Sequence, residues 1–386
     1  MRAVQDLRRW WVRGSRRWWR AFLLLWLPLF LTGCWDRIEI EDRAIVMGLG
    51  IDGGEEVRVT YQFPLVSKLR PDSHGDGPSF MTKTCSGRTI GEAMERLQGQ
   101  IQEAVFFGHI RTVVFSETAA TRGIQQEIDF LRRDPMVRPQ VYVIVTPKTA
   151  QEFLETPVKT EQIPSLGLVR MITHDARLGR LPKLHLGEFL VRLDSPAIDP
   201  VAPIFHQEEG TFHWDGLAVF AHDRMVGRLS REEAEVFMRL RDGKRGGSVT
   251  VEGANGETVL IKFFHLRRRV KVQAVGDRPQ LVVKLELEGN VGEITDLAQK
   301  APAMGRISSR EARMLEAKAA EKVKTETEEL IRKVQSEYRS DIFGLGEWVQ
   351  AYRPDLFREN WNEIFPQVGI EVEVTVRLRR YGMTGI

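Results

Sequence analysis

The stretch AIVMGLGIDGGEEVRVTYQF, residues 44–63, bears most directly on the fold of the chain. Its glycines Gly48, Gly50 and Gly53 spell G-x-G-x-x-G behind an apolar run, which is the spacing of a dinucleotide-binding loop. Such a loop leads into a helix whose N-terminus holds the pyrophosphate. Here Gly54 is followed by EEVRVTYQF, whose alternating pattern predicts a strand. We therefore predict a β-hairpin with a turn at residues 52–54, in which glycine supplies positive φ, and no nucleotide site.

A secretory signal is predicted upstream of this hairpin. Residues 1–20 carry seven arginines against one acid, and the eleven apolar residues 21–31 follow. This pattern is typical of a signal peptide, and the run, which contains Pro28, is shorter than the about 17–25 residues of a membrane-spanning helix. Residues 31–34, LTGC, resemble a bacterial lipobox, so we predict cleavage after residue 33 and lipidation of Cys34. The alternative is a cytosolic protein with a basic tail and a buried Cys34.

Removal of the signal changes the charge of the chain. The precursor has a net charge of +3, and residues 1–33 contribute seven positive charges and one negative charge, so the mature chain carries about −3. A nearly neutral chain gives no electrostatic reason to expect nucleic acid as a partner. Cys85 is then the other cysteine, and with Cys34 acylated no intrachain disulfide can form. We expect Cys85 to be a core or strand residue.

The predicted fold class is α+β, with several domains, mixed or antiparallel sheets and helices packed on them. The proline-rich run 194–203 is the best linker candidate. We therefore predict a lipoprotein signal peptide at 1–33, an N-terminal α+β region at 34–197 with room for two subdomains, and a C-terminal α+β domain at 198–386. In the C-terminal domain a long amphipathic helix, at about 308–340, is expected to lie on a sheet.

Periodicity predicts the individual elements. In the N-terminal region strands are expected at 44–51, 57–66, 110–116 and 140–146, and helices at 89–101, 119–133, 150–155, 165–173 and 184–193. The C-terminal region is expected to hold a hairpin at 214–230 that turns at 222–223, a short helix at 231–240, and strands at 258–275, 279–294 and 370–382.

Residues that could carry chemistry are sparse. His206 and His213 flank Glu208 and Glu209 in the densest set of metal-ligand types, but H-x₆-H is not a zinc-site spacing. We predict a polar loop that enters a strand there. The serines lack a G-x-S-x-G context. The sequence predicts no catalytic residue, no metal site and no cofactor, and hence no enzyme.

Several motifs follow one another in an order that resembles a known family. They are LTGCWDRIEIEDRAIVMGLGID, SGRTIGEAMERL, the block from FFGHIRTVVFS to RRDPMVRPQVYVIVT, DGLAVFAHDRMVGRLSREEAEVF, GNVGEI with the long charged helix, and DIFGLGEWVQAYRPDLFRENWNEIF. Together they resemble the C subunits of bacterial spore germinant receptors, the Ger(x)C lipoproteins. The resemblance covers essentially the whole mature chain. Phe106 and Phe107 stand where that family usually has a Tyr/Trp pair.

The resemblance implies a non-enzymatic subunit required for spore germination. It would work by protein–protein contact with two integral-membrane subunits, A and B. The lipid on Cys34 would be its sole covalent group and would anchor it to the outer face of the cytoplasmic membrane, which in spores is the inner membrane. The alternative function is an extracytoplasmic solute-binding lipoprotein of a transporter.

Beyond Cys34, a few residues in the shared motifs are candidates for interface or structural roles. Glycine suits turns, tryptophan suits core filling, and Asp-Pro ends helices, so we favour fold maintenance for each of them. The candidates are Gly108, His109, Arg133, Asp134, Gly344, Gly346, Trp348 and Trp361.

Overall fold

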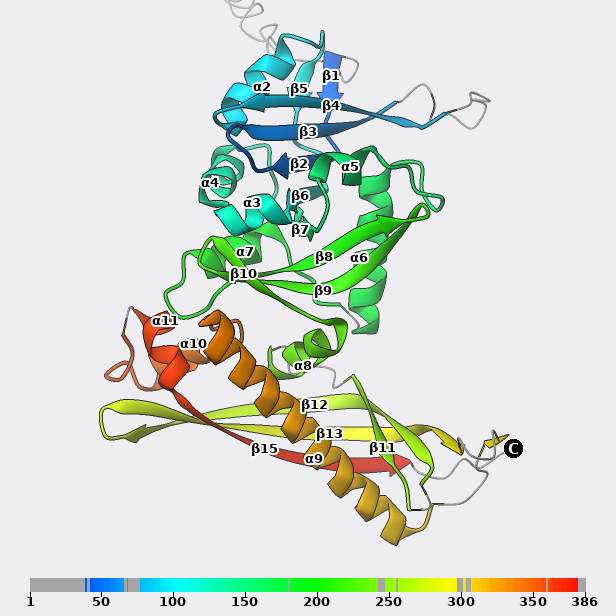
Figure 1. Cartoon of the computed structure of the whole chain (residues 1–386), viewed down its shortest axis with the longest axis vertical. Coiled ribbons are helices and arrows are strands. Elements are labelled where there is room, and N and C mark those ends of the chain that lie inside the picture. The colour runs from blue at the N-terminus through cyan, green and yellow to red at the C-terminus, as the bar shows by residue number, and fades with distance from the viewer. Residues whose placement is uncertain are drawn as a thin grey trace, which may run out of the picture. The chain divides into compact units, whose positions relative to one another are not determined.

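Three β-sheets and the helices packed on them make up the part of the chain that the computed structural model describes, which confirms the α+β class (Figure 1). The described residues are 39, 42–65, 68, 77–179, 181–241, 247–254, 256–296, 301–302, 307–358 and 360–380. The predicted signal peptide and Cys34 lie outside them. The chain divides into two units, Met1–Arg43 and Ala44–Ile386, and the elements below belong to the second unit apart from Arg43.

The largest sheet has eight strands in the order β10-β9-β8-β7-β6-β2-β3-β4. Its centre, β2-β6-β7-β8, is parallel, and the outer strands on both sides join by antiparallel pairing. Every residue of β2, β6 and β7 is buried, as expected for parallel strands covered on both faces. The bounds are β2 Gly48–Asp52, β3 Val57–Pro64, β4 Phe80–Gly87, β6 Thr112–Ser116, β7 Tyr142–Thr146, β8 Val201–Glu208, β9 Thr211–Ala221 and β10 Arg224–Leu229. A separate two-stranded sheet pairs β1 Arg43–Ile45 with β5 Ala104–Phe106.

The predicted hairpin at the opening stretch is confirmed, because β2 and β3 are antiparallel neighbours with Asp52 opposite Arg58. The expected positive φ in its turn is wrong: neither Gly53 nor Gly54 has a positive φ. Gly53 is instead needed for close packing, since a Cβ there would lie 3.0 Å from the Cα of Ala119. The next element in the chain is a strand, so no helix N-terminus follows the three glycines.

The glycines of β2 allow two helices, α5 Ala150–Glu155 and α6 Pro164–Leu178, to pack closely against the strand. A Cβ on Gly50 would lie 2.9 Å from Leu154 Cδ1 and 3.1 Å from the Cβ of Ala150, and a Cβ on Gly48 would overlap the Ser165 hydroxyl. Both helices therefore rest directly on the strand backbone, which a larger residue would prevent.

Two buried polar side chains, Asp52 and Gln62, hold these helices against the strands by hydrogen bonds. The Asp52 carboxylate accepts the Ala150 N–H at 2.7 Å and the Gln151 N–H at 3.1 Å, so it satisfies orphan donors at the start of α5. Gln62 donates to Leu154 O at 2.7 Å, and its Oε1 accepts the Ser165 hydroxyl at 2.6 Å and the Ser165 N–H at 3.2 Å. The G-x-G pattern is thus a packing feature.

Helices cover both faces of the eight-stranded sheet. One apolar core contains buried residues of α2, α3, α4 and α7, and a second core on the other face contains those of α5 and α6. The bounds are α2 Ile90–Gln98, α3 Glu117–Arg122, α4 Gln125–Arg133 and α7 Leu186–Leu193. The single helix predicted at 119–133 is wrong, because Gly123 adopts φ +114 and separates α3 from α4.

The predicted linker at 194–203 is also wrong. Residues 197–200 are buried, and Val201 begins β8, which pairs with β7 inside the large sheet. Proline was a misleading signal here, since it suits turns and strand starts as well as linkers. The proposed domain division at residues 197 and 198 therefore falls just before a strand of the sheet that both sides build, and it stays a prediction.

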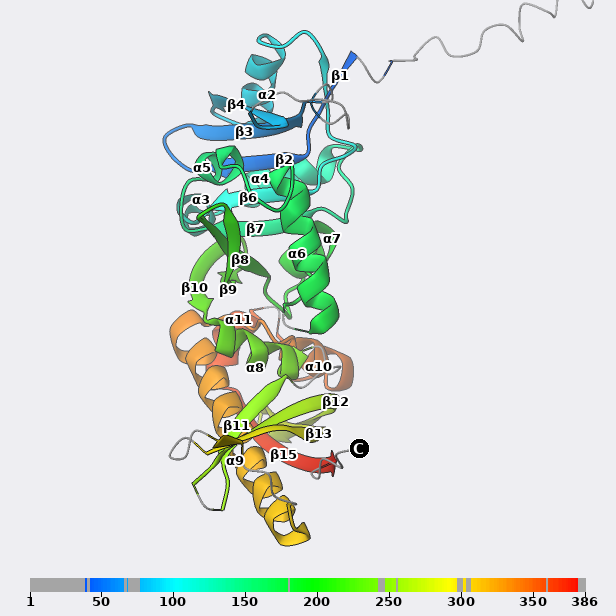
Figure 2. The same ribbon diagram turned by 90° about the vertical axis from the view of Figure 1, so that its right-hand side faces the viewer.

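A five-stranded sheet and a long helix form the C-terminal part (Figures 1 and 2). β11, β12 and β13 are antiparallel, and β15 lies parallel to β13. The bounds are α8 Arg231–Arg241, β11 Ser248–Glu252, β12 Thr258–Val275, β13 Arg278–Asp296, β14 Ala301–Pro302, α9 Ser309–Lys333, α10 Leu345–Tyr352, α11 Trp361–Ile364, the 3₁₀ turn Phe365–Gln367 and β15 Gly369–Arg380.

The long helix predicted at about 308–340 is confirmed as α9 with a π-helical turn, Val334–Tyr338, at its end. Ser308 and Glu311 form a reciprocal capping box at its start. The apolar stripe of this amphipathic helix is buried: Leu315, Ala319, Val323, Thr327 and Leu330. The helix packs against the two outer strands β11 and β15, so it lies across the sheet (Figure 1).

The end of the helix is fastened to the large sheet. The Tyr338 hydroxyl donates to Arg228 O at 2.8 Å, and its ring lies on Gly227, where a Cβ would overlap the ring. Arg339 then adopts a left-handed conformation with φ 52, which turns the chain toward Ser340.

The close packing of α6 on β2 predicts that substitutions at Gly48 and Ser165 have non-additive effects on the free energy of unfolding. Gly48→Ala should lower the free energy of unfolding by about 1–3 kcal/mol, because its Cβ would overlap the Ser165 hydroxyl. In a Ser165→Ala background the same change should cost at least about 1 kcal/mol less. Denaturant unfolding of the four proteins checks this, and strictly additive effects would contradict the packing described here.

Candidate functional site

Two of the predicted residues, Gly346 and Trp361, donate hydrogen bonds to one buried carboxylate, that of Asp341, and Gly344 lies in the same segment of the chain. Asp341 is fully buried. Its Oδ2 accepts the Gly346 N–H at 2.7 Å and the Trp361 Nε1–H at 2.9 Å, and its Oδ1 accepts the Phe343 N–H at 3.1 Å. Every contact in this group comes from a neutral donor, so the hydrogen bonds take the place of a countercharge.

The two glycines are required by close approach. Gly344 precedes α10 with φ +71, in the left-handed region that favours glycine. A Cβ on Gly346 would lie 2.6 Å from the carbonyl oxygen of Ala197 and 2.6 Å from Trp361 Nε1. Trp361 is completely buried between the rings of Phe357 and Phe365. These features fit the predicted role in fold maintenance, which stays a prediction.

A second buried carboxylate, Asp199, lies beside the first. Its Oδ1 accepts the His222 N–H at 2.8 Å and the Asn362 amide at 3.1 Å, and its Oδ2 accepts the Asp341 N–H at 3.1 Å. In return the Asp199 N–H donates to Asp341 O at 2.9 Å. We call these two residues the Asp199–Asp341 joint. It ties the chain before β8, the β9–β10 turn and the segment that carries α10 and α11.

Burial sets the electrostatics of the joint. It raises the pKa of Asp341 to about 6, and the nearby Asp199 charge adds to this rise, while the Gly346 N–H and the Trp361 indole oppose it. Burial also raises the pKa of Asp199, against hydrogen bonds from His222 and Asn362 that lower it. Desolvation therefore outweighs the donors at both groups.

Trp348 occupies a different, more open position on α10. Its ring stacks on Tyr352 with centroids 5.5 Å apart, and the guanidinium of Arg268 lies 5.8 Å from its ring centroid. Tyr352 is 65% exposed, so the stack presents an aromatic surface next to a cation. Residues of this kind are enriched at the centres of protein interfaces.

Gly108 and His109 lie in the loop after β5. A Cβ on Gly108 would lie within the Phe106 ring, and the exposed His109 ring packs on the same ring at 5.9 Å in an edge-on arrangement. The loop is tied to the residues before β2, since the Val46 N–H donates to Phe106 O at 3.0 Å. Gly108 thus has a packing role, and His109 is available at the surface.

Arg133 and Asp134 end α4, as the sequence predicts. The Asp134 N–H donates to Phe130 O, and its side chain accepts the Met136 N–H at 2.8 Å, which forms the turn before β7. Arg133 is exposed. The structure therefore places this pair in a helix-ending turn, in another loop than Gly108 and His109.

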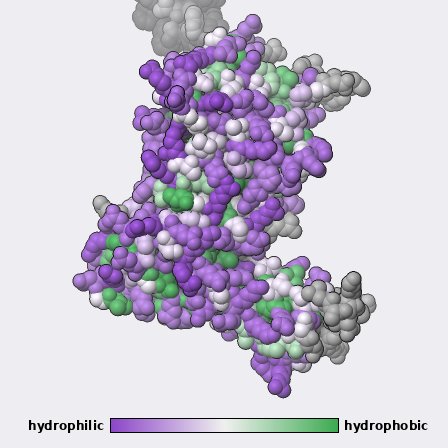
Figure 3. All heavy atoms as spheres, in the orientation of Figure 1, coloured by the Kyte–Doolittle hydropathy of each residue, from purple (hydrophilic) through white to green (hydrophobic). Residues whose placement is uncertain are grey.

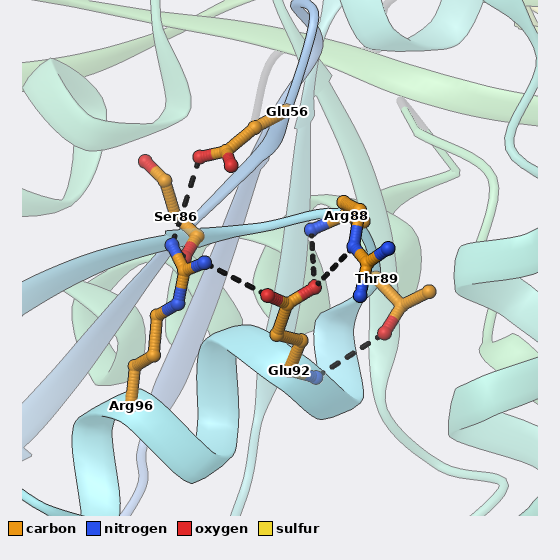
Figure 4. Close-up of polar contacts among 6 residues, drawn as sticks. All are labelled: Glu56, Ser86, Arg88, Thr89, Glu92 and Arg96. Carbon is orange, nitrogen blue, oxygen red and sulfur yellow. Dashed lines mark hydrogen bonds and ion pairs between the residues drawn. The ribbon is translucent and has the colours of Figure 1, made fainter.

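A dense exposed polar network surrounds the start of α2 (Figure 4). Thr89 caps the helix through the Glu92 N–H at 3.2 Å, and Glu92 accepts from the Arg88 N–H at 3.0 Å and from Arg96 at 2.8 Å. The hydrogen bonds from Arg88 lower the pKa of Glu92. Arg96 also donates to Ser86 O at 2.6 Å. The charges are engaged with one another at the surface, so we interpret the network as a helix cap.

A cavity of about 360 Å³ lies between α8, β11 and α9. The side chain of Arg239 in its wall is only 3% exposed and donates to Glu326 and Ser248 O, and Lys333 donates to Glu233 at 2.8 Å. Burial raises the pKa of the neighbouring Glu235. Two ion pairs of the cavity wall, Arg239–Glu326 and Lys333–Glu233, join α8 to α9.

The histidine-rich stretch forms the β8–β9 hairpin, with Glu209 and Gly210 in its turn, instead of the predicted polar loop. His206 and His213 stack with centroids 5.1 Å apart, and His206 Nδ1 lies 2.5 Å from Asp215. Within the described part of the chain, no three His, Cys, Asp or Glu residues are arranged to hold a metal ion.

The visible surface is mostly hydrophilic, with hydrophobic residues in small scattered groups (Figure 3). Among the described residues, the exposed large apolar or aromatic side chains are spread over several elements, with two of them in β12: Met136, Val191, Val226, Phe264, Val275 and Tyr352. Among the described residues, no helix combines the length and the apolar character needed to span a bilayer. Cys85 is buried in β4, as predicted.

Sequence reasoning missed the two carboxylates of the joint. Asp341 is a single acid before the apolar pair Ile342-Phe343, and Asp199 is a single acid between Ile198 and Pro200. An isolated acid in an apolar segment is the signal that could have found them, because a buried carboxylate requires several donors.

The comparisons with known proteins match both halves of the chain. The family described as "Spore germination protein N-terminal domain" matches residues 36–207, and the family described as "Spore germination B3/ GerAC like, C-terminal" matches residues 215–382. The chain belongs to the Ger(x)C family. These two matches follow the order of the motifs in the sequence and cover most of the chain.

The chain is also similar to individual proteins and to one solved structure. YfkR of Bacillus subtilis (strain 168) is 31% identical over 250 residues, which cover 61% of this chain and 64% of YfkR. Spore germination protein B3 of the same organism is 22% identical over 94% of this chain and 98% of its own length. The crystal structure of the GerBC protein matches with a TM-score of 0.58 and 17% identity, covering 86% of this chain and 97% of that chain, so it shows the same fold.

The close packing at the joint predicts the effect of one added methyl group. Gly346→Ala should lower the free energy of unfolding by about 2 kcal/mol or more, because its Cβ would lie 2.6 Å from two fixed groups. Gly91→Ala in α2 is the control, since its nearest neighbour would be 3.8 Å away, and it should be neutral or slightly stabilising. Thermal and denaturant unfolding give the stability of both variants. Equal losses of stability in Gly346→Ala and Gly91→Ala would contradict the close packing described here.

Proposed function

We propose that this Ger(x)C protein is the lipid-anchored subunit of a nutrient germinant receptor and acts through contacts with the integral-membrane A and B subunits. The observation that carries the proposal is the order of its parts: a lipobox that ends at Cys34 directly precedes the two matched spore germination domains. The protein is expected on the outer face of the cytoplasmic membrane and, in spores, on the inner membrane.

A binding role without catalysis fits the polar groups that the structure describes. The carboxylates of the joint accept hydrogen bonds from neutral donors, and both cations in the wall of the cavity between α8, β11 and α9 are in ion pairs, Arg239 with Glu326 and Lys333 with Glu233. A catalytic acid, base or nucleophile has to reach a substrate. We therefore infer that the protein contributes surface, for which the Trp348–Tyr352 stack and the exposed His109 are candidates.

The lipid on Cys34 would hold the protein at the bilayer. A diacylglyceryl group and a further acyl chain bury methylenes worth about 0.8 kcal/mol each, which is enough for durable attachment. Eight peptide steps separate Cys34 from Asp42, so Asp42 would lie within about 29 Å of the anchor. This tether would keep the protein close to membrane subunits.

Replacement of Cys34 tests the proposal. Cys34→Ala should abolish incorporation of radiolabelled palmitate, release the protein from the membrane fraction or leave it as an unprocessed precursor, and slow nutrient-triggered germination. Cys85→Ala is the matched control, because that thiol is buried and should not be acylated. Normal labelling of the Cys34→Ala protein would overturn the anchor assignment, and normal germination with an unlabelled protein would overturn the need for anchoring.

A further inference from the structure

The Asp199–Asp341 joint places two carboxyl groups in one buried site where three segments of the chain meet. Both residues are almost completely buried, and the backbone of each donates a hydrogen bond to the other residue. Ser340 adds a hydrogen bond from its hydroxyl to Phe220 O at 2.7 Å. Hydrogen bonds between residues 340–346 and the large sheet are therefore concentrated at this site.

The groups that face the joint carry little compensating charge. The donors to the two carboxylates are backbone N–H groups, the Trp361 indole and the Asn362 amide. From the β9–β10 turn, His222 lowers the pKa of Asp199, through its backbone N–H and through its side chain. From α10, the Glu347 carboxylate lies beside Gly344 and adds negative charge. Arg339, two residues before Asp341, is exposed.

We propose that the Asp199–Asp341 joint is a protonation-dependent fastening that holds the segment bearing α10 and α11 tightly on the large sheet under acidic conditions and loosens it as the pH rises. Two ionised carboxylates in one apolar site repel each other and lose hydration, and a bound proton removes both costs. The same segment carries Trp348 and Tyr352, so the joint would couple pH to the aromatic surface of α10.

The sign of the effect follows from the direction of the pKa changes. The pKa of Asp341 is raised to about 6 from the ordinary 3.8, so between these values the folded protein holds a proton that the unfolded chain has released. Stability from this group is therefore full below about pH 4 and falls as the pH rises to about 6. The raised pKa of Asp199 acts in the same direction.

The Trp361 indole provides a direct probe of this proton. Its Nε1–H donates to Asp341, so the indole resonance in ¹H–¹⁵N spectra of the full chain should shift with pH and show a midpoint near 6. Trp361→Phe identifies the resonance by its disappearance. A resonance that is unchanged between about pH 4.5 and about pH 7.5 would overturn the proposal.

Hydrogen–deuterium exchange tests the loosening itself. After correction for the intrinsic rate, peptides that cover 340–350 should exchange about tenfold faster at about pH 7.5 than at about pH 5, whereas β6 should not change. Asp199→Asn should lower this ratio without abolishing it, because it removes the second titrating carboxylate and the charge that adds to the rise of the Asp341 pKa, whereas burial of Asp341 remains. Asp355→Asn, at an exposed carboxylate bound to Arg353, is the control and should keep the ratio.

The exchange ratios of the wild type and of Asp199→Asn together decide whether the joint responds to pH. A ratio of about ten that Asp199→Asn lowers and Asp355→Asn leaves unchanged supports the joint. A ratio near one in the wild type, or an equal ratio in the wild type and Asp199→Asn, contradicts it. If Asp199→Asn fails to fold, the indole titration and the exchange ratio of the wild type still give a result on their own.

Discussion

The contact between Gln62 and the helices α5 and α6 is the constraint on which the large sheet depends. Gln62 satisfies the last turn of α5 and the first turn of α6 at once, and this is possible because Gly48 and Gly50 leave no side chain between β2 and the helices. Asp52 completes the arrangement at the other end of α5. One face of the parallel strands is thereby sealed, and β6, β7 and β8 can follow in order as buried strands.

The elements that the sequence predicts well are those with a strong period. The buried stripe of α9 repeats every three to four residues over its whole length, and β12, β13 and β15 alternate, so their positions follow from pattern alone. The hairpin after β2 was predictable because a strand pattern follows Gly54. The opposite interpretation, a nucleotide loop, needed a helix at that place.

The elements that were predicted wrongly depend on contacts between distant residues. Gly123 breaks what looks like one helix because its φ is +114 where the chain meets the β9–β10 turn, and no local pattern reveals that meeting. Asp199 and Asp341 are 142 residues apart, so neither signals the other. Of the candidate residues, Gly346 and Trp361 both donate to Asp341 and Gly344 lies in the same segment, whereas Cys34 belongs to a processing motif outside the described residues.

The central claim is that this Ger(x)C protein works as a receptor subunit. The most direct measurement is affinity purification of the tagged chain from detergent-solubilised spore membranes, followed by mass spectrometry and quantification of the partners. We expect recovery of two integral-membrane germinant receptor proteins, A and B, in near-equal amounts with the chain. Recovery of the chain alone, or with the permease and ATPase of a transporter in their place, would contradict it.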